Sequence, residues 1–166
     1  TASGKTEAAF LPLCTRLLQK SEIAQTSGID LLYISPLKAL INDQWGRLDR
    51  LCEALEIPVH RWHGDVSQSR KAEVFKRPSG VLLITPESLE ALFMRHGTQI
   101  ARLFASVDSV VVDELHAFFG SERGRQLQSL LHRVEVSCGK RIRRVGLSAT
   151  LADLTLAAEF LRPGQS

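Results

Sequence analysis

The tripeptide Gly4-Lys5-Thr6 lies at the head of a stretch with helical spacing, and its residue types are those of a phosphate-binding loop. Backbone N–H groups and the helix dipole hold phosphate oxygens at such a position. Lys5 would reach the β- and γ-phosphates, the Thr6 hydroxyl would ligate Mg²⁺, and Ser3 and Gly4 would complete the cradle. We expect the first glycine of the full signature to lie upstream of Thr1. Taken alone, the tripeptide is more simply an ordinary helix N-terminus with an exposed lysine.

A second candidate is the run Val110-Val111-Val112, which ends in the two carboxylates Asp113 and Glu114. Phosphoryl transfer needs one group for the metal and another for the nucleophile. Asp113 would hold Mg²⁺, partly through water, and Glu114 would polarise the attacking water. A solvated acidic strand end is the plain alternative. Because a phosphate loop and a carboxylate pair occur on separate elements, the sequence favours an ATP-hydrolysing site.

Other polar positions have plainer explanations. Ser148 and Thr150 follow a weak apolar run, where a hydroxyl can cap the next helix, with Asp153 as an alternative cap; spacing alone favours a cap. His60 and His63 have no third ligand at a suitable spacing, so we expect core or solvent histidines rather than a metal site.

These residues require strands and helices that bring them together. Continuous apolar runs predict buried parallel strands at 31–34, 81–84 and 110–112, a weaker one at 144–147, and a short edge strand at 59–62. Apolar residues at helical spacing predict helices over 37–55, after Ser121, and over about 5–20, where Pro12 should cause a kink. Strands that alternate with helices indicate an α/β fold with a mostly parallel sheet, and functional residues gather at the carboxyl ends of its strands.

Composition sets looser limits. The 166 residues carry a formal charge of +3, which permits a polyanionic partner without requiring one. No apolar run is long enough to cross a bilayer, so we expect no membrane partner. Cys14, Cys52 and Cys138 are scattered, which predicts three buried thiols in a reducing cytoplasm rather than disulfides or a zinc site. The chain is expected to form one domain, 1–166.

The order of the motifs resembles that of superfamily 2 helicases of the DEAD/DEAH-box type. Gly4-Lys5-Thr6, Asp113-Glu114-Leu115-His116 and Ser148-Ala149-Thr150 look like motifs I, II and III. Ser35-Pro36-Leu37-Lys38 resembles motif Ia, and Thr85-Pro86-Glu87 resembles motif Ib. The segments Thr6–Phe10, His63-Gly64-Asp65 and Asp113–Gly124 are similar to the large helicase-related (Lhr) group and its Ski2-like neighbours.

The resemblance implies a three-layer RecA-like P-loop NTPase domain that binds ATP and Mg²⁺ and serves as the first motor domain of a DNA or RNA helicase. A second RecA-like domain of the same parent chain, with its arginine finger, would lie outside this sequence, so we expect the domain alone to hydrolyse ATP negligibly. The Lhr resemblance tilts the expected partner toward single-stranded or tailed DNA and the role toward DNA repair. By the same resemblance, Ser35, Pro36, Lys38, Thr85, Pro86 and Glu87 would contact nucleic acid, and His116, Ser148 and Thr150 would couple it to the ATP site.

Two other functions remain open. A small P-loop kinase would need an acceptor pocket and an arginine-bearing lid, and it would not explain motifs Ia and Ib. A nucleic-acid-binding module without turnover is the second alternative, and the presence of Lys5 and Glu114 argues against it.

Overall fold

Five parallel strands form one sheet in the order β2-β3-β1-β4-β5. The structure is a computed structural model that describes residues 4–23, 27–150 and 153–164. All five predicted strands are present, and the short strand predicted for an edge, β2, is one of the two edge strands. The strands are β1 (Leu31–Ile34), β2 (Val59–Trp62), β3 (Val81–Ile84), β4 (Ser109–Val112) and β5 (Arg143–Gly146).

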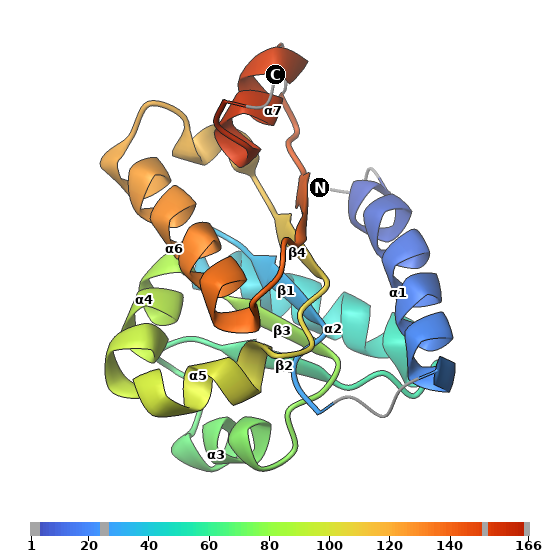
Figure 1. Ribbon diagram of the computed structural model, residues 1–166. Coiled ribbons are helices and arrows are strands. Elements are labelled where there is room, and N and C mark those ends of the chain that lie inside the picture. Colours follow the sequence, from blue (N-terminus) through green and yellow to red (C-terminus); the bar gives the residue numbers. More distant parts are fainter. Residues whose placement is uncertain (1–3, 24–26, 151–152, 165–166) are drawn as a thin grey trace.

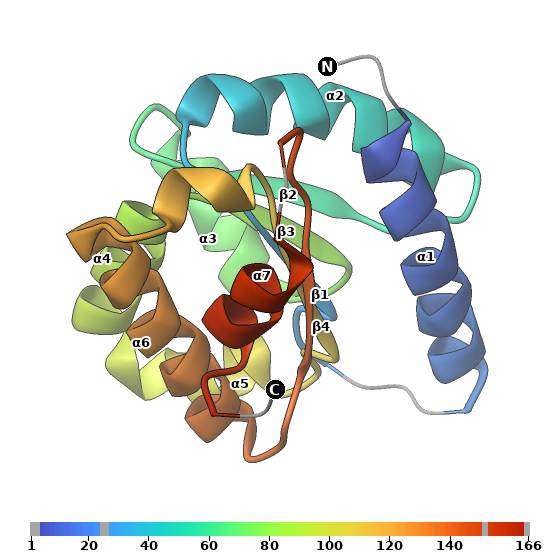
Figure 2. The same cartoon turned by 90° about the horizontal axis from the view of Figure 1, so that it is seen from above.

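Helices cover both faces of the sheet, which confirms the three-layer α/β architecture (Figure 1 and Figure 2). Two helices, α1 and α2, lie on one face, whereas α4, α5 and α6 lie on the other. The helices are α1 (Lys5–Ile23), α2 (Lys38–Glu53), α3 (Gln68–Lys76), α4 (Pro86–Arg95), α5 (Gly97–Phe104), α6 (Glu122–Cys138) and α7 (Leu154–Leu161), with a short 3-10 helix η1 (Leu115–Phe118) before α6.

Alternation along the strands divides the core in two. Leu31 and Tyr33 of β1 point toward α1 and α2 and pack with Phe10, whereas Leu32 and Ile34 point toward the opposite helices. Successive side chains of a strand point to opposite faces, so a strand covered on both faces must be apolar throughout. This requirement explains why continuous apolar runs identified the central strands.

Helix α1 contains Pro12 on its exposed side, as the sequence predicted, and runs on past it. A proline inside a helix removes one backbone hydrogen bond, and the exposed position lets water satisfy the carbonyl left without a donor. The predicted kink stays a prediction.

The cysteines differ from their prediction in one respect. Cys14 and Cys52 are buried and their sulfur atoms lie 3.9 Å apart across α1 and α2, whereas Cys138 is only half-buried. All three are free thiols. Cys14 and Cys52 are thus close in space although they are 38 positions apart in the sequence. None of the helices within the described ranges is long and apolar enough to cross a membrane.

Candidate nucleotide and nucleic-acid site

The motif residues gather at the carboxyl edge of the sheet because the backbone ladder continues one residue beyond the strands. Asp113 N donates to Ile34 O at 2.8 Å, Leu147 N to Val112 O at 2.8 Å, and Ser35 N to Ile84 O at 3.1 Å. These bonds fix the first loop residue after each of three strands. The functional side chains therefore start from rigid backbone.

One pocket joins the predicted residues of motifs I, II and III. Its lining comes from the head of α1, the end of β4, the loop after β5 and one face of α2. The first three groups were predicted from the sequence to lie at one edge of the sheet, and they do. Gly4 begins α1 with a positive φ of 65°. Ser3, also predicted for the phosphate loop, lies outside the described residues. The lining residues are Lys5, Thr6, Leu40, Gln44, Asp113, Glu114, Leu147, Ser148 and Ala149.

Asp113 is buried and accepts two hydrogen bonds. The Tyr33 hydroxyl donates to Oδ2 at 2.5 Å and the Glu114 backbone N–H to Oδ1 at 2.9 Å. Burial, followed by the nearby Asp113 charge, raises the pKa of the Tyr33 phenol, so it stays protonated and keeps donating. Each carboxylate oxygen has a second lone pair, so Asp113 is oriented but still able to accept a further ligand.

Glu114 adopts a left-handed backbone conformation, with φ 48° and ψ 46°. Such a conformation is uncommon for a residue other than glycine, costs on the order of 1–3 kcal/mol and concentrates at functional sites. Its Oε2 lies 3.4 Å from His116 Nδ1, and its side chain is about a quarter exposed. The strained turn therefore directs a second carboxylate into the pocket beside Asp113.

Motifs II and III are in direct contact through His116. Its Nδ1 lies 2.7 Å from Ser148 Oγ, and the backbone N–H of Leu115 donates to Leu147 O at 2.8 Å. Thr150 contributes only a backbone N–H, 3.4 Å from Ser148 Oγ.

The helix cap that spacing favoured at Ser148 and Thr150 is wrong. Asp153 caps α7, because its Oδ1 accepts from Thr155 N at 2.8 Å and from Leu156 N at 3.1 Å. Ser148 bonds His116 instead, so a tertiary contact takes the hydroxyl that local sequence would assign to a cap.

The predicted nucleic-acid-binding residues divide into buried and exposed sets. Ser35, Pro36, Thr85 and Pro86 are buried, and Thr85 Oγ1 caps α4 by accepting from Ser88 N at 3.2 Å. Lys38 and Glu87 are exposed, and each is in an ion pair. The side chains of the buried set therefore shape the loops.

Lys38 pairs with Asp65, whose motif the sequence left without a role. Lys38 Nζ lies 3.0 Å from Asp65 Oδ2, and the hydrogen bond and charge of the lysine hold the pKa of this exposed carboxyl below its ordinary value. His63 Nε2 lies 2.9 Å from Asn42 Oδ1, and Asp65 N donates to His63 Nδ1 at 3.3 Å, so a histidine fixes the loop that carries Asp65. Among the described residues, no group of three or more potential metal ligands occurs.

Two residues of the site escaped the sequence analysis. Gln44 lines the pocket that joins motifs I, II and III; it is more than nine-tenths buried, and its Oε1 has no hydrogen-bond partner in the described part of the chain. Arg123, at the start of α6, contacts both Pro36 and Glu87. A polar residue on the apolar face of a helix was the available signal for Gln44, whereas nothing local marks Arg123.

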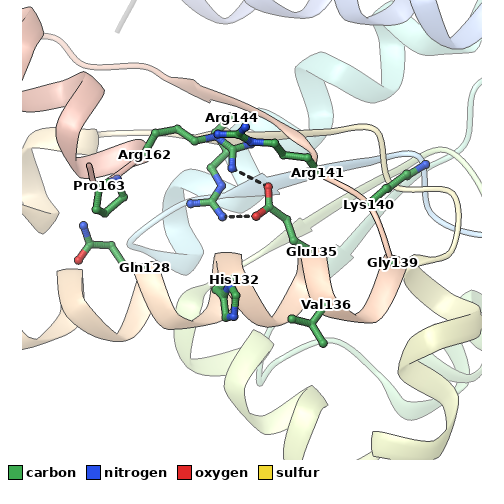
Figure 3. Close-up of a pocket in the computed structure, with 10 residues that line it drawn as sticks. All are labelled: Gln128, His132, Glu135, Val136, Gly139, Lys140, Arg141, Arg144, Arg162 and Pro163. Carbon is green, nitrogen blue, oxygen red and sulfur yellow. Dashed lines mark hydrogen bonds and ion pairs between the residues drawn. The ribbon is translucent and has the colours of Figure 1, made fainter. Parts of the chain in front are cut away.

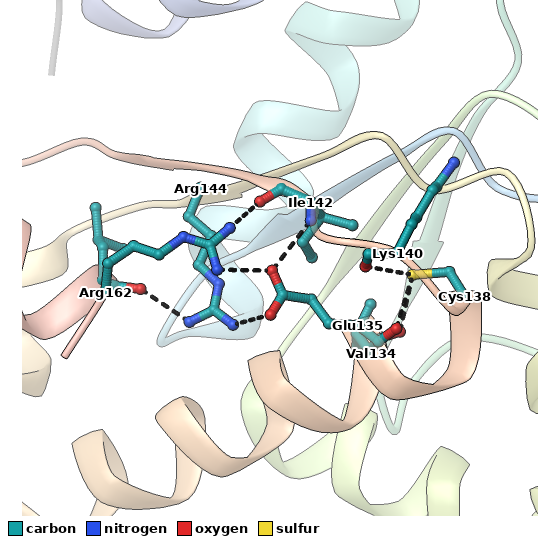
Figure 4. A network of polar contacts seen from close by, with 8 residues as sticks. Val134, Glu135, Cys138, Lys140, Ile142, Arg144 and Arg162 are labelled. Atoms are coloured by element: carbon teal, nitrogen blue, oxygen red, sulfur yellow. Dashed lines mark hydrogen bonds and ion pairs between the residues drawn. The ribbon is translucent and has the colours of Figure 1, made fainter. Parts of the chain in front are cut away.

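A further hollow lies elsewhere, beside the first residues of β5 (Figure 3). It is lined by several cations, but Glu135 neutralises two of them: its Oε2 lies 2.8 Å from Arg144 Nη2 and its Oε1 lies 2.8 Å from Arg162 Nη1. Glu135 also accepts from Ile142 N at 3.0 Å (Figure 4). This network ties α6, β5 and the end of α7 together at the edge opposite the motifs. It is structural.

Comparison with known proteins agrees with this geometry. Residues 1–157 match the model of the DEAD/DEAH box helicase family. The chain is 34% identical over 173 residues to ATP-dependent helicase Lhr-Core of Methanothermobacter thermautotrophicus, covering 97% of this chain and 20% of that protein. It is 31% identical over 180 residues to Lhr helicase/uracil glycosylase of Escherichia coli, covering 97% of this chain and 11% of that protein. The chain therefore spans about a fifth or less of the length of these relatives.

Solved structures show the same relationship. Helicase Lhr of Mycobacterium smegmatis bound to ssDNA and AMP-PNP has a TM-score of 0.78 at 34% identity, covering 96% of this chain and 21% of that one. DUF1998 helicase MrfA bound to DNA has a TM-score of 0.78 at 29% identity, with 96% and 22% covered. DEAD-box helicase Mss116 bound to ssRNA and UDP-BeF, at 18% identity and a TM-score of 0.83, shares the fold. The chain belongs to the DEAD/DEAH box helicase family, as a helicase domain similar to those of the Lhr helicases.

Proposed function

We propose that this domain binds ATP and couples its hydrolysis to translocation along nucleic acid or unwinding of it. The observation that carries the proposal is the single pocket that holds Lys5, Thr6, Asp113 and Glu114 and connects to motif III through Ser148. A small kinase would not need the His116–Ser148 contact between motifs II and III, nor the loops that follow β1 and β3.

The nucleotide phosphates would lie at the head of α1. Backbone N–H groups there attract anions, and the exposed Lys5 amine can leave Ser148 O, 3.2 Å away, for the β- and γ-phosphates. Ser3 and Gly4 belong to the same proposed cradle. The cradle binds phosphate through backbone and one cation, so these contacts recognise the phosphates and not the base.

The residues present fit a Mg²⁺ ion. Thr6 and Asp113 are buried oxygen donors on facing elements, and Gln44 contributes an orphaned amide oxygen to the same pocket. Mg²⁺ keeps several waters and takes only one or two protein ligands beside phosphates, so few carboxylates suffice. Thr6 and Asp113 would hold the ion, the latter partly through water; when bound, it neutralises charge on the phosphates.

Glu114 would act on the attacking water. Its carboxylate stands beside Asp113 on a strained turn, is not buried, and can accept a proton from water. The transition state also needs a cation on the γ-phosphate, which we propose comes from the arginine finger of a second RecA-like domain of the parent protein. The isolated domain would therefore turn over ATP negligibly.

Nucleic acid would lie across the loops that follow β1 and β3. Lys38 is exposed there and would leave the Asp65 carboxylate, 3.0 Å away, to bind phosphate. Buried Ser35, Pro36, Thr85 and Pro86 present the backbone of those loops. Contacts to the sugar-phosphate backbone give sequence-independent, salt-sensitive binding. Because the Lhr relative is bound to ssDNA and MrfA to DNA, we propose DNA as the preferred track, with a role in repair. His116, Ser148 and Thr150 would couple this track to the ATP site.

ATP turnover by the full-length protein, with and without single-stranded DNA or RNA, tests the proposal. We expect stimulation by one nucleic acid, and loss of turnover in Glu114→Gln with nucleic-acid binding retained. Turnover that ignores both nucleic acids, or that survives the Glu114 change, would refute a motor. Binding without turnover in the wild-type protein would instead indicate a nucleic-acid-binding module.

A further inference from the structure

Arg123 contacts two of the predicted nucleic-acid-binding loops at once. Its Nε lies 2.6 Å from Glu87 Oε1 and its Nη2 lies 3.0 Å from Glu87 Oε2, so the guanidinium binds the carboxylate through two parallel hydrogen bonds. The same Nη2 donates to the backbone carbonyl of Pro36. Paired bonds of this kind add directional specificity to charge attraction.

The partners belong to different segments. Pro36 follows β1 in motif Ia, and Glu87 lies in the first turn of α4, in motif Ib. Arg123 lies in the first turn of α6, which begins at Glu122, a short loop after η1; η1 itself follows the Asp113-Glu114 turn of motif II. One side chain therefore joins both loops of the proposed track to the segment that carries the proposed catalytic carboxylates.

The start of α6 is itself pinned to η1. Ser121 caps the helix by accepting from Gly124 N at 3.0 Å, and its hydroxyl donates to Phe118 O at 3.0 Å. A Cβ at Gly124 would lie 1.9 Å from Phe118 O, so only glycine permits this approach. The guanidinium of Arg123 also lies 5.7 Å from the Phe118 ring. These contacts connect Arg123 to η1.

We propose that Arg123 is a positioning residue that sets the spacing of the motif Ia and Ib loops and links them to motif II. Glu87 then serves to hold Arg123, because a bare carboxylate on the track would repel phosphates. This inference rests on the proposed function, since it concerns the affinity of the same track. A lysine at this position could not replace the arginine, because an ammonium cannot make the two parallel bonds.

A second ion pair between the same helices provides a matched control. Arg133 Nη1 of α6 lies 2.7 Å from Glu90 Oε1 of α4, and its guanidinium lies 4.3 Å from the Phe93 ring. The exposures of Arg123 and Arg133 are similar, at 34% and 37% of the side chain. Arg133→Ala therefore removes a comparable helix-to-helix bridge that contacts neither loop.

The test uses the full-length protein, ATP, and single-stranded DNA or RNA, whichever stimulates the wild type. For Arg123→Ala and Arg123→Lys, we expect the nucleic-acid concentration for half-maximal stimulation to rise by roughly tenfold, about the effect of one lost charge-assisted bond. Affinity for a fluorescent ATP analogue without nucleic acid should change less than about twofold, within the scatter of independent sites. Arg133→Ala should leave both quantities near wild type.

A double-mutant cycle with Glu87→Gln separates positioning from direct contact. If Arg123 and Glu87 act as one unit, the double variant should be no worse than Arg123→Ala alone. Additive losses, or equal losses in Arg123→Ala and Arg133→Ala, would overturn the inference while leaving the motor intact. Absence of stimulation in the wild type would overturn the proposed function instead, so the two failures are distinguishable.

Discussion

The amine of Lys5 donates a hydrogen bond to the backbone carbonyl of Ser148 at 3.2 Å, which connects the α1 side of the proposed nucleotide pocket to its β5 side. If Lys5 binds the phosphates as proposed, its amine must leave Ser148 O. Nucleotide binding is therefore expected to release the loop that also carries the His116 contact. The conformation of motif III would then depend on whether the Lys5 amine binds phosphate or Ser148 O.

Replacing Lys5 with alanine should lower affinity for a fluorescent ATP analogue by about 10- to 100-fold, the range for a lost charge-assisted contact. Nucleic-acid binding without nucleotide should persist, because Lys5 lies outside the loops of the track. The measurement is a fluorescence titration of the full-length protein. Lys76→Ala, an exposed lysine on α3, is the charge-matched control. Unchanged affinity for the ATP analogue in Lys5→Ala would show that Lys5 does not bind the phosphates.

The Ser148→Ala variant should separate nucleotide binding from stimulation. The hydroxyl bonds His116 Nδ1 at 2.7 Å, whereas the carbonyl that accepts from Lys5 belongs to the backbone and survives the change. We expect ATP-analogue affinity near wild type and the nucleic-acid-stimulated rate to fall by roughly tenfold, the worth of about one hydrogen bond. Steady-state turnover against nucleic-acid concentration measures it. Stimulation equal to wild type would mean that the two motifs communicate by another route.

The sequence predicted the parts of the molecule that local chemistry determines. The runs at 31–34 and 81–84 had to be apolar on both faces. Asp113 and Ser148 follow predicted strands and Lys5 begins a predicted helix, which placed all three at the carboxyl edge of a parallel sheet. Contacts between distant residues were beyond such reasoning: the bond from Tyr33 to Asp113 spans 80 positions.

The error at Ser148 has the same origin. Ser148, Thr150 and Asp153 are all residue types that cap helices, and spacing favoured a cap at the two hydroxyls, with Asp153 as the alternative that the structure has. The outcome depends on His116, 32 residues away, which takes the Ser148 hydroxyl. Arg123 escaped notice because Pro36 is 87 positions from it and local sequence gives no sign of that contact.

Replacement of Gln44 should change stability and activity in opposite directions. Its Oε1 is buried with no partner among the described residues, and a buried unsatisfied polar group costs about 1–3 kcal/mol. Gln44→Leu should therefore raise the melting temperature of the nucleotide-free protein and lower stimulated turnover, because the oxygen is then missing from the loaded pocket. Thermal unfolding and turnover of the same preparation test both halves. A variant that is less stable and fully active would show that the amide is structural.

Glu135 predicts a dependence of stability on pH. Burial raises the pKa of this carboxyl, but the Ile142 N–H and the charges of Arg144 and Arg162 outweigh burial, so the pKa lies below its ordinary value of 4.5. A group whose pKa is depressed by folding stabilises the folded state above its ordinary pKa, and that contribution is lost as pH falls through the depressed value.

Glu135→Gln should accordingly lower the free energy of unfolding by about 3 kcal/mol at neutral pH, because it leaves the buried guanidinium of Arg144 and the partly exposed one of Arg162 without their counter-charge. The difference in free energy of unfolding between the two proteins should shrink as pH falls below 4.5, because protonation of Glu135 removes its stabilising charge in the wild type. Glutamine carries no charge at any pH, so the variant loses nothing there. Urea unfolding from neutral pH to below pH 4 measures this convergence. Glu122→Gln, a nearly fully exposed glutamate on the same helix, should follow wild type throughout. Parallel curves for wild type and Glu135→Gln at all pH values would mean that ionisation of Glu135 does not hold α6, β5 and α7 together.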